Sequence, residues 1–261
     1  MQFKDKMSAP DANVSPSDAN IPFSGSAEGC LFSVIIPVFH ESEIINTLLQ
    51  KLREHQSRDN LEIIVVDGSD QHDTIDIIHS ENVICLQSKK GRARQMNAGA
   101  AVARGDVLIF LHADTHVPDN AFSCIKSVLE DTMVVGGAFD LGIRSNRVIF
   151  TTIAKIASWR SRITRVPYGD QGIFMRRNYF HALGGYRDVP LMEDVDIMQR
   201  IKRRGDKICI LPEKVYTAPR RWEREGILYC TLRNWIVLVL YCFGISPHKL
   251  VRYYRANGEL S

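Results

Sequence analysis

Several features common in secreted, zinc-binding and membrane-spanning proteins are missing from this sequence. Its six cysteines are scattered and form no C-x-x-C pair, which excludes the usual zinc spacings and favours reduced thiols. The first 18 residues contain no apolar stretch of the kind that a secretory signal peptide needs. An apolar run at 235–243 has nine residues, too short to span a bilayer. We therefore expect a cytoplasmic protein.

The composition is also without extremes. Lys and Arg number 33 and Asp and Glu 30, so the formal net charge is +3, too small to indicate a nucleic-acid partner. Hydrophobic residues make up 45% and charged residues 24% of the 261 positions, as in ordinary globular domains. Wholesale disorder and a disulfide-stapled miniprotein are excluded. The dinucleotide fingerprint G-x-G-x-x-G and the P-loop are absent too.

What is present is an alternation of strands and helices after a polar tail. Residues 1–30 have no apolar period and are predicted to be disordered. Strands are predicted at 32–38, 61–67, 83–87 and 106–111, with helices at 44–52, 73–80 and 92–103, the last closed by Gly105. This order predicts an α/β fold with a parallel sheet.

The second half is less regular. Helices are predicted at 120–131, 147–162 and 195–204, with strands at 134–142, 172–175 and 207–211. Two helices, at about 226–243 and 247–256, end the chain. We divide it into the tail, a domain at 31–224 and a C-terminal helical extension at 225–261.

Carboxylates follow three of the predicted strands. Glu41 comes after the first, Asp67 ends the second, and Asp114 follows the fourth. Ligands of open α/β sheets bind beyond the carboxyl ends of the strands, so the three are expected to face one crevice. The alternative for Asp67 and Asp114 is that each caps the turn that follows it.

A basic, glycine-containing loop precedes the helix at 92–103. Gly91 and Arg92 stand at its start, among four cations between Lys89 and Arg94. A helix N-terminus favours anions, and a diphosphate suits this one. The alternative is a solvated basic turn.

A divalent cation is expected beside that loop. Mg²⁺ or Mn²⁺ is held by one or two carboxylates together with phosphate oxygens, and Asp114 is the candidate ligand. His112 lies two residues earlier, on the same side of an extended segment, and imidazole suits Mn²⁺ better than Mg²⁺. His112 bonded to the backbone is the alternative.

Glu193 and Asp194 form a second acidic pair at the start of a predicted helix. The helix dipole alone favours carboxylates there. The functional alternative is a general base, which contributes about 10²–10⁴-fold when it is positioned on an acceptor hydroxyl.

These residues together resemble the family 2 inverting glycosyltransferases, which have the GT-A (nucleotide-diphospho-sugar transferase) fold. The matching pieces come in the family's order and cover about 32–211: 34–37 (VIIP), Glu41, 65–69 (VVDGS), 91–93 (GRA), Asn97, Gly99, 111–115 (LHADT), 168–172 (YGDQG), Glu193 and Asp194. LHADT and YGDQG look most like a bacterial subgroup usually met as uncharacterised sequences.

The resemblance implies a mostly parallel sheet flanked by helices, a nucleotide-diphospho-sugar donor and a role for each matching residue. Asp194 would be the catalytic base, and Asp114 would bind a metal ion, Mn²⁺ or Mg²⁺, that bridges the diphosphate. The donor would lie against Pro37, Glu41, Asp67, Gly91, Arg92 and Asp114. The acceptor or phosphates would lie near Asp170, Gln171, Glu193, Arg221 and Trp222.

The sequence departs from the family where it has His112 in place of the first Asp of D-x-D, which leaves the metal open. Two other functions are considered: a sugar-nucleotide nucleotidyltransferase and a non-catalytic nucleotide-sugar binding module. The acidic loop after the first strand argues against the former, because that class has a Gly-rich basic loop there. Asp114 and Asp194 argue against the latter.

Two further segments bear on the acceptor, an unidentified hydroxyl compound. Between Arg144 and Arg177 there are eight cations and a single acid, Asp170. The segment is either a solvated helix face or a site for an anionic acceptor or lipid head groups. The apolar run at 235–243 packs as a core helix or lies in a membrane interface, where it would present a lipid-linked acceptor. If the run at 235–243 lies in a membrane interface, the protein is peripheral on the inner membrane face.

Overall fold

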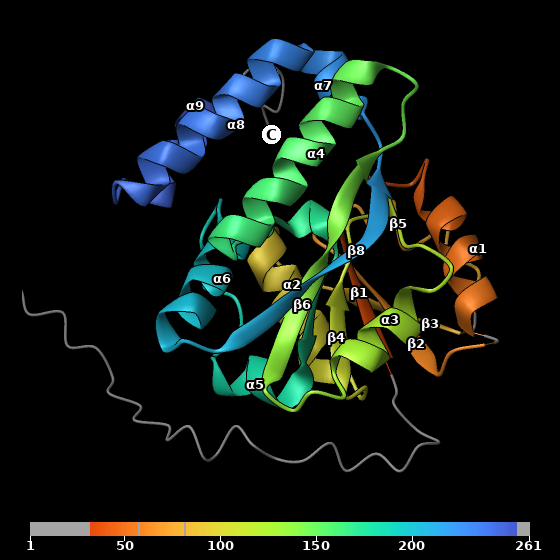
Figure 1. Ribbon diagram of the computed structural model, residues 1–261. Coiled ribbons are helices and arrows are strands. Elements are labelled where there is room, and N and C mark those ends of the chain that lie inside the picture. Colours follow the sequence, from red (N-terminus) through yellow and green to blue (C-terminus); the bar gives the residue numbers. More distant parts are fainter. Residues whose placement is uncertain (1–31, 57, 81, 255–261) are drawn as a thin grey trace, which may run out of the picture.

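The computed structural model describes residues 32–56, 58–80 and 82–254, and the tail predicted for 1–30 lies outside them. In the described part, one eight-stranded sheet has the order β3-β2-β1-β4-β7-β6-β8-β5. Helices cover both of its faces (Figure 1). This confirms the predicted α/β architecture.

The strands are β1 (Phe32–Val38), β2 (Leu61–Asp67), β3 (Val83–Gln87), β4 (Val107–Phe110), β5 (Thr115–His116), β6 (Val134–Ile143), β7 (Ile173–Arg176) and β8 (Lys207–Thr217). The helices are α1 (Ile45–Gln56), α2 (Arg92–Val102), α3 (Ala121–Val128), α4 (Val148–Thr164), the 3₁₀ turn η2 (Gly169–Gln171), α5 (Arg177–Ala182), α6 (Glu193–Arg204), α7 (Arg220–Glu225), α8 (Ile227–Cys242) and α9 (Pro247–Tyr254).

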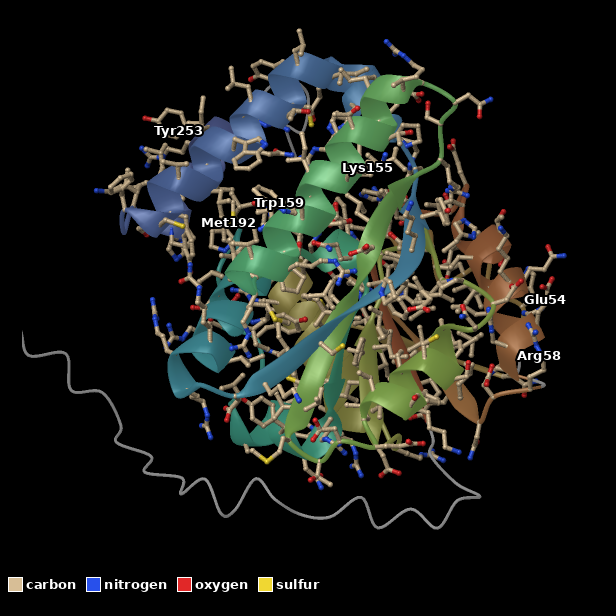
Figure 2. All side chains as sticks on the ribbon, viewed as in Figure 1. Glu54, Arg58, Lys155, Trp159, Met192 and Tyr253 are labelled. Atoms are coloured by element: carbon tan, nitrogen blue, oxygen red, sulfur yellow. The ribbon has the colours of Figure 1, made fainter. Side chains whose placement is uncertain are left out.

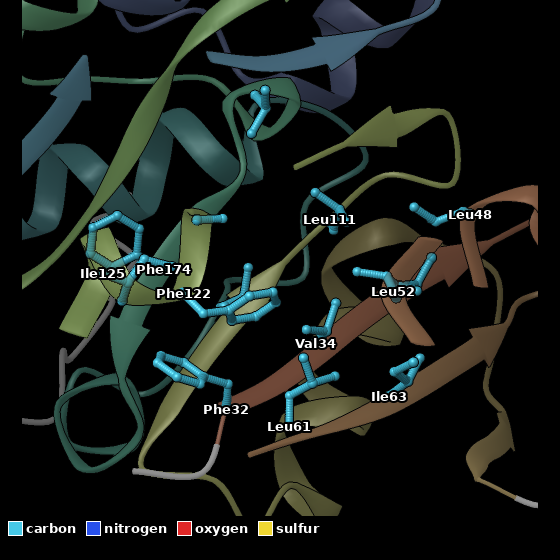
Figure 3. Packing of buried hydrophobic residues seen from close by; sticks show 14 of the residues in the cluster. Phe32, Val34, Leu48, Leu52, Leu61, Ile63, Leu111, Phe122, Ile125 and Phe174 are labelled. Carbon is cyan, nitrogen blue, oxygen red and sulfur yellow. The ribbon is translucent and has the colours of Figure 1, made fainter. Parts of the chain in front are cut away.

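The strands β3, β2, β1 and β4 are all parallel to one another, as predicted. Because side chains alternate across a strand, β1 contributes to two cores. Phe32 and Val34 pack with α1 and α3, where Phe122 meets the Phe32 ring at 5.1 Å (Figure 3). Ile35 faces the opposite layer, which includes α2 and α6. Burial on both faces explains why β2 is almost continuously apolar.

The other half of the sheet is mixed. β7 is antiparallel to both β4 and β6, whereas β6 and β8 are parallel. β8 runs six residues past its predicted end at Leu211, to Thr217. The register with β6 skips two residues there, so Pro212 lies in a bulge, where a strand tolerates a proline. The extension brings Thr217 beside β5 and the end of β4.

Two local predictions are wrong. Residues 73–77 form a series of turns and 78–80 are irregular, so 73–80 is not a helix. Four β-branched residues, Thr74, Ile75, Ile77 and Ile78, disfavour a helix there, and the isoleucines pack onto the core. Gly105 does not cap α2, because the helix ends at Ala103 in an extended conformation. The N–H of Gly105 instead donates to the Ser33 hydroxyl at 2.9 Å.

The C-terminal helices α8 and α9 pair with each other and pack on the second core layer (Figure 1). Val237 is buried, and Leu238 and Leu240 are half-buried against that layer. On the opposite side of α8, Val239 and Phe243 are exposed. The run at 235–243 therefore has one packed and one exposed face. No helix in the described ranges has the length and hydrophobicity needed to cross a bilayer.

Candidate functional site

A cleft with a cavity volume of about 190 Å³ opens beyond the ends of β4 and β8. Its walls come from α2, α6, α7 and the segments that follow β4 and β8. Eight of the residues singled out in the sequence line it: Arg92, His112, Asp114, Asp170, Glu193, Asp194, Arg221 and Trp222. The structure thus brings residues from distant parts of the sequence together in one cleft.

Asp194 stands in the first turn of α6 with its carboxylate fixed by two backbone donors. The N–H of Gly169 donates to Oδ2 and the N–H of Val195 to Oδ1, both at 2.7 Å. Met192, which precedes the helix, has a φ of 67°, an uncommon conformation for a non-glycine residue and one that concentrates at functional sites. The turn aims the acidic pair into the cleft.

The cleft holds more negative charge than its cations balance. Burial, and next the charge of Asp194, raise the pKa of Glu193 to about 7. The same two causes raise the pKa of Asp170 to about 6, and its Oδ1 has no hydrogen-bond partner among the described residues. A cation bound nearby would favour the charged form of both carboxyl groups.

The raised pKa of Glu193 leads to a prediction about stability. The folded state binds a proton at Glu193 more readily than the unfolded chain, so this residue costs stability as pH rises from about 4.5 through about 7. Glu193→Gln should therefore raise the free energy of unfolding at pH 8, by on the order of 3 kcal/mol, and so the melting temperature, and leave both nearly unchanged at pH 4. Thermal unfolding at both pH values measures this, and an equal shift at both would contradict it.

Two strand-end carboxylates share one arginine. Nη2 of Arg220, the first residue of α7, lies 3.2 Å from Oε2 of Glu41 and 3.4 Å from Oδ2 of Asp114. Burial raises the pKa of Glu41, and Arg220 offsets part of that increase. Glu41 thus reaches the edge of the site through Arg220, a residue that the sequence motifs do not single out. The adjacent motif Arg221-Trp222 was the available signal.

Asp67 ends β2 in a fully buried position. Its Oδ1 accepts the N–H of Ser69 at 2.8 Å, as in a turn cap, while Oδ2 has no partner in the described part of the chain. A buried acceptor without a donor is costly, so Oδ2 is suited to a ligand N–H or O–H. Pro37 is half-buried in neighbouring β1. Neither residue lines the cleft itself.

The start of α2 has a glycine and no side-chain cap, so a ligand can approach its backbone N–H groups closely. Gly91 has a φ of 137°, which favours glycine, and the helix has no side-chain cap. Arg92 follows at the cleft wall. Gln95 of the same helix donates to the carbonyls of Val38 at 2.6 Å and Val66 at 2.8 Å, and so fixes α2 against the ends of β1 and β2. The sequence around Gln95 carries no local signal for this role.

Gln171, expected near the acceptor, is fully buried behind the cleft. Its Oε1 accepts the Ser161 hydroxyl at 2.6 Å and the Tyr168 N–H at 3.1 Å, and its Nε2 donates to the Phe139 carbonyl at 2.9 Å. All its polar atoms are used inside the protein. Gln171 therefore positions the loop that carries Gly169 and Asp170.

The donor set near Asp114 is compatible with a divalent cation. Burial, and next the charge of Arg92, lower the pKa of His112 to about 4, which leaves its imidazole neutral and able to act as a ligand. No three His, Cys, Asp or Glu side chains of the described residues converge into a ready-made cage. Mg²⁺ and Mn²⁺ sites completed by substrate phosphates do not need one.

Arg221 and Trp222 form the wall of the cleft opposite α6. Arg221 pairs with Glu225 at 3.3 Å, and the Trp222 ring packs edge-on against Phe150 at 5.9 Å. The indole Nε1 of Trp222 is buried without a partner in the described residues. This wall offers an aromatic surface and a free donor to a ligand.

Comparison with solved structures shows which fold this is. A mannosyltransferase from Pyrobaculum calidifontis, PcManGT in complex with GDP-Man and Mn²⁺, is similar with a TM-score of 0.53 and 19% identity, over 71% of this chain and 56% of that one. TarS 1–349 of S. aureus is similar with a TM-score of 0.57 and 16% identity, over 79% and 64%. The fold is GT-A.

Curated sequences give a consistent answer. A probable glycosyltransferase of Bacillus subtilis, YdaM, is 26% identical over 74% of this chain and 50% of its own length. The amylovoran biosynthesis glycosyltransferase AmsB of Erwinia amylovora is 36% identical over 32% of this chain and 30% of its own length. This chain thus spans half or less of those two relatives. The model of the family described as glycosyl transferase family 2 matches residues 33–184, more than half of the chain. The chain belongs to glycosyl transferase family 2.

Proposed function

We propose that this protein transfers a sugar from a nucleotide-diphospho-sugar to an acceptor hydroxyl, with inversion at the anomeric carbon. The observation that carries the proposal is Asp194, a carboxylate fixed by two backbone donors in the same cleft as Asp114 and Arg92. One oriented base suffices for an inverting displacement, because a single in-line attack needs no second nucleophile.

We assign the donor side of the site from the polar groups that are available there. The orphan Oδ2 of Asp67 accepts a hydrogen bond from the nucleoside, beside Pro37 and Glu41. Arg92 and the uncapped N-terminus of α2 at Gly91 face the diphosphate. PcManGT, a similar fold, holds GDP-Man, which supports this class of donor.

Asp114 is proposed to hold a divalent cation, Mn²⁺ or Mg²⁺, with neutral His112 beside it. When bound, such an ion neutralises charge on the leaving diphosphate, which is worth several kcal/mol in comparable sites. The Mn²⁺ in the PcManGT complex supports this assignment. Arg220 lies 3.4 Å from Asp114, and we assign its guanidinium to the same phosphates.

The chemical step uses the chain's own groups as follows. Asp194 accepts the proton of the acceptor hydroxyl, whose oxygen attacks the anomeric carbon from the face opposite the diphosphate. The bond to the diphosphate oxygen breaks, and Arg92 stabilises the negative charge that develops there. Glu193 and Asp170 border the acceptor side, together with Arg221 and Trp222.

A donor panel tests the proposed function. Thermal shift with UDP-, GDP-, ADP- and dTDP-sugars in the presence of Mn²⁺ identifies the donor, and release of the nucleoside diphosphate then measures turnover. We expect stabilisation by one nucleotide class and slow release even with water as acceptor. If no donor binds, the proposal fails. Release of pyrophosphate from a nucleoside triphosphate and a sugar phosphate would indicate a nucleotidyltransferase instead.

Asp67→Asn tests the nucleoside assignment. The side-chain oxygen still accepts from Ser69, whereas the amide that replaces Oδ2 donates and can no longer accept. Donor affinity should fall about tenfold, the typical effect of losing one hydrogen bond to a charged group. Titration calorimetry measures it, with Asp70→Asn, exposed on the same loop, as the control. Equal affinities for both variants would remove Asp67 from the donor site.

A further inference from the structure

Helix α8 presents its apolar side to solvent and its only charge to the protein. The exposed residues are Leu228, Tyr229, Leu232, Trp235, Ile236, Val239, Cys242 and Phe243. Phe243 and Leu228 are 83% and 79% exposed, respectively. Arg233, the one charged residue of α8, is buried and forms an ion pair with Glu225 of α7. A helix whose outer side faces only water has its charged residues on that side and its apolar residues against the protein.

Helix α4 carries a second exposed apolar stripe. Val148, Ile156, Trp159 and Ile163 recur at helical spacing, and Trp159 is 67% exposed. Figure 2 shows Trp159 and Lys155 on this helix and Tyr253 on α9. Ile156 of α4 and Trp235 of α8 line one groove, so the stripes of the two helices meet across it. We call the exposed apolar residues of both helices the α4–α8 face.

The groove connects this face with the catalytic cleft. Its inner end is formed by Tyr168, Asp170, Trp222 and Asn234, all of which also line the cleft. The rest of its lining is mostly apolar and includes Leu141, Ile153 and Ile156. A chain entering between α4 and α8 would therefore reach the acceptor side of the site.

The segments that bear the face contain no acidic residue. Neither 141–169 nor 226–254 includes a single Asp or Glu. Arg160, Arg162 and Arg165 are engaged with backbone carbonyls, which uses part of the predicted basic surface. Exposed cations in these two segments include Arg147, Lys155, Lys249 and Arg252. The apolar surface thus has a positively charged border.

We propose that the α4–α8 face docks on an anionic lipid bilayer, with the groove opening toward the lipid. Apolar burial and attraction to anionic head groups add in such peripheral binding, and Trp and Tyr suit the interface. A second copy fits less well, because the cations of α4 and α9 that border each face would repel those of the other copy. The inference is independent of glycosyl transfer, except that the groove would deliver a lipid-linked acceptor to the proposed site.

Vesicle sedimentation of the full chain tests the docking. Wild-type protein should pellet with phosphatidylcholine vesicles that contain phosphatidylglycerol, and much less with phosphatidylcholine alone. Binding should weaken at 1 M salt, where the Debye length is about 3 Å instead of about 10 Å at 0.1 M. Leu232→Glu/Val239→Glu should reduce binding about tenfold or more, because two charges enter the apolar stripe. Met133→Glu is the matched control, because Met133 is 61% exposed and lies outside the face.

The chain's own tryptophans give a second measurement. Trp159 and Trp235 lie on the face and Trp222 in the cleft, and these are the three tryptophans of the sequence. Lipids with brominated acyl chains should quench the wild-type fluorescence, and Trp159→Phe should remove much of that quenching while vesicle binding persists. Quenching that does not change in Trp159→Phe would overturn the proposed orientation.

Three results would overturn the proposal. One is wild-type protein that stays in the supernatant with anionic vesicles, and another is equal binding by the Leu232→Glu/Val239→Glu and Met133→Glu variants. The third is a wild-type dimer in light scattering that the double variant converts to a monomer, which would assign the face to a second copy. Donor-induced thermal shift, measured on the same variants, reports separately on the proposed function.

Discussion

Asp194→Asn should reduce sugar transfer about 10²–10⁴-fold, the usual contribution of a positioned general base. Donor affinity should stay within about twofold, because the base acts on the acceptor and not on the nucleotide. The amide keeps one of the two hydrogen bonds from Gly169 and Val195, so the melting temperature should fall only slightly. Initial rates with the identified donor, together with calorimetric donor affinity, measure both effects.

The competing base is the neighbouring Glu193, whose raised pKa also suits proton transfer near pH 7. If Asp194→Asn retains turnover while Glu193→Gln loses it, the base is Glu193 and Asp194 is a cap of α6. A collapse of donor affinity in Asp194→Asn would place that residue in the donor site. Asp188→Asn, an exposed carboxylate paired with Arg94, controls for general effects of losing a charge.

Asp114→Asn should lower turnover about 10²-fold or more, because several kcal/mol of charge stabilisation at the leaving group depend on the ion that we propose Asp114 holds. Excess chelator should produce a similar loss in the wild type, and Mn²⁺ or Mg²⁺ should restore it. The fold should persist, since Asp114 supports little of the core and its contacts with Thr217 and Arg220 are 3.4 Å long.

Full turnover of Asp114→Asn, or of wild type in excess chelator, would contradict the metal assignment. Arg92 and Arg220 would then be the principal positive charges available to the diphosphate. Arg220→Ala distinguishes the two cases, because it should be far more damaging in a metal-independent enzyme. Circular dichroism of each variant separates loss of activity from loss of fold.

Much of the first half of the chain could be predicted because its signals are local. β2 is apolar on both faces since helices cover both, and the carboxylates follow strands whose ends necessarily share one edge. The segment at 73–80 was mispredicted because tertiary packing of Ile75, Ile77 and Ile78 outweighed an apolar pattern. β8 was predicted too short because Pro212 resembles a strand end, and only pairing with β6 turns it into a bulge.

The site could be predicted in part, for a similar reason. Asp114, Asp194 and Arg92 belong to motifs, and a motif carries its own local signal. Arg220 reaches Glu41 across 179 positions of sequence, and Gln95 bridges two strand ends. Such long-range contacts leave no local pattern. Gln171 shows the converse, since it lies inside a motif and yet is buried in the scaffold.

Stereochemistry tests the central claim most directly and needs no knowledge of the acceptor. With the donor identified by the panel, slow transfer to water can be followed by proton NMR of the released sugar. The account predicts that the first anomer to appear has the configuration opposite to that of the donor, and that Asp194→Asn suppresses its appearance. First appearance of the retained anomer, or release at the same rate without Asp194, would contradict an inverting transfer at this cleft.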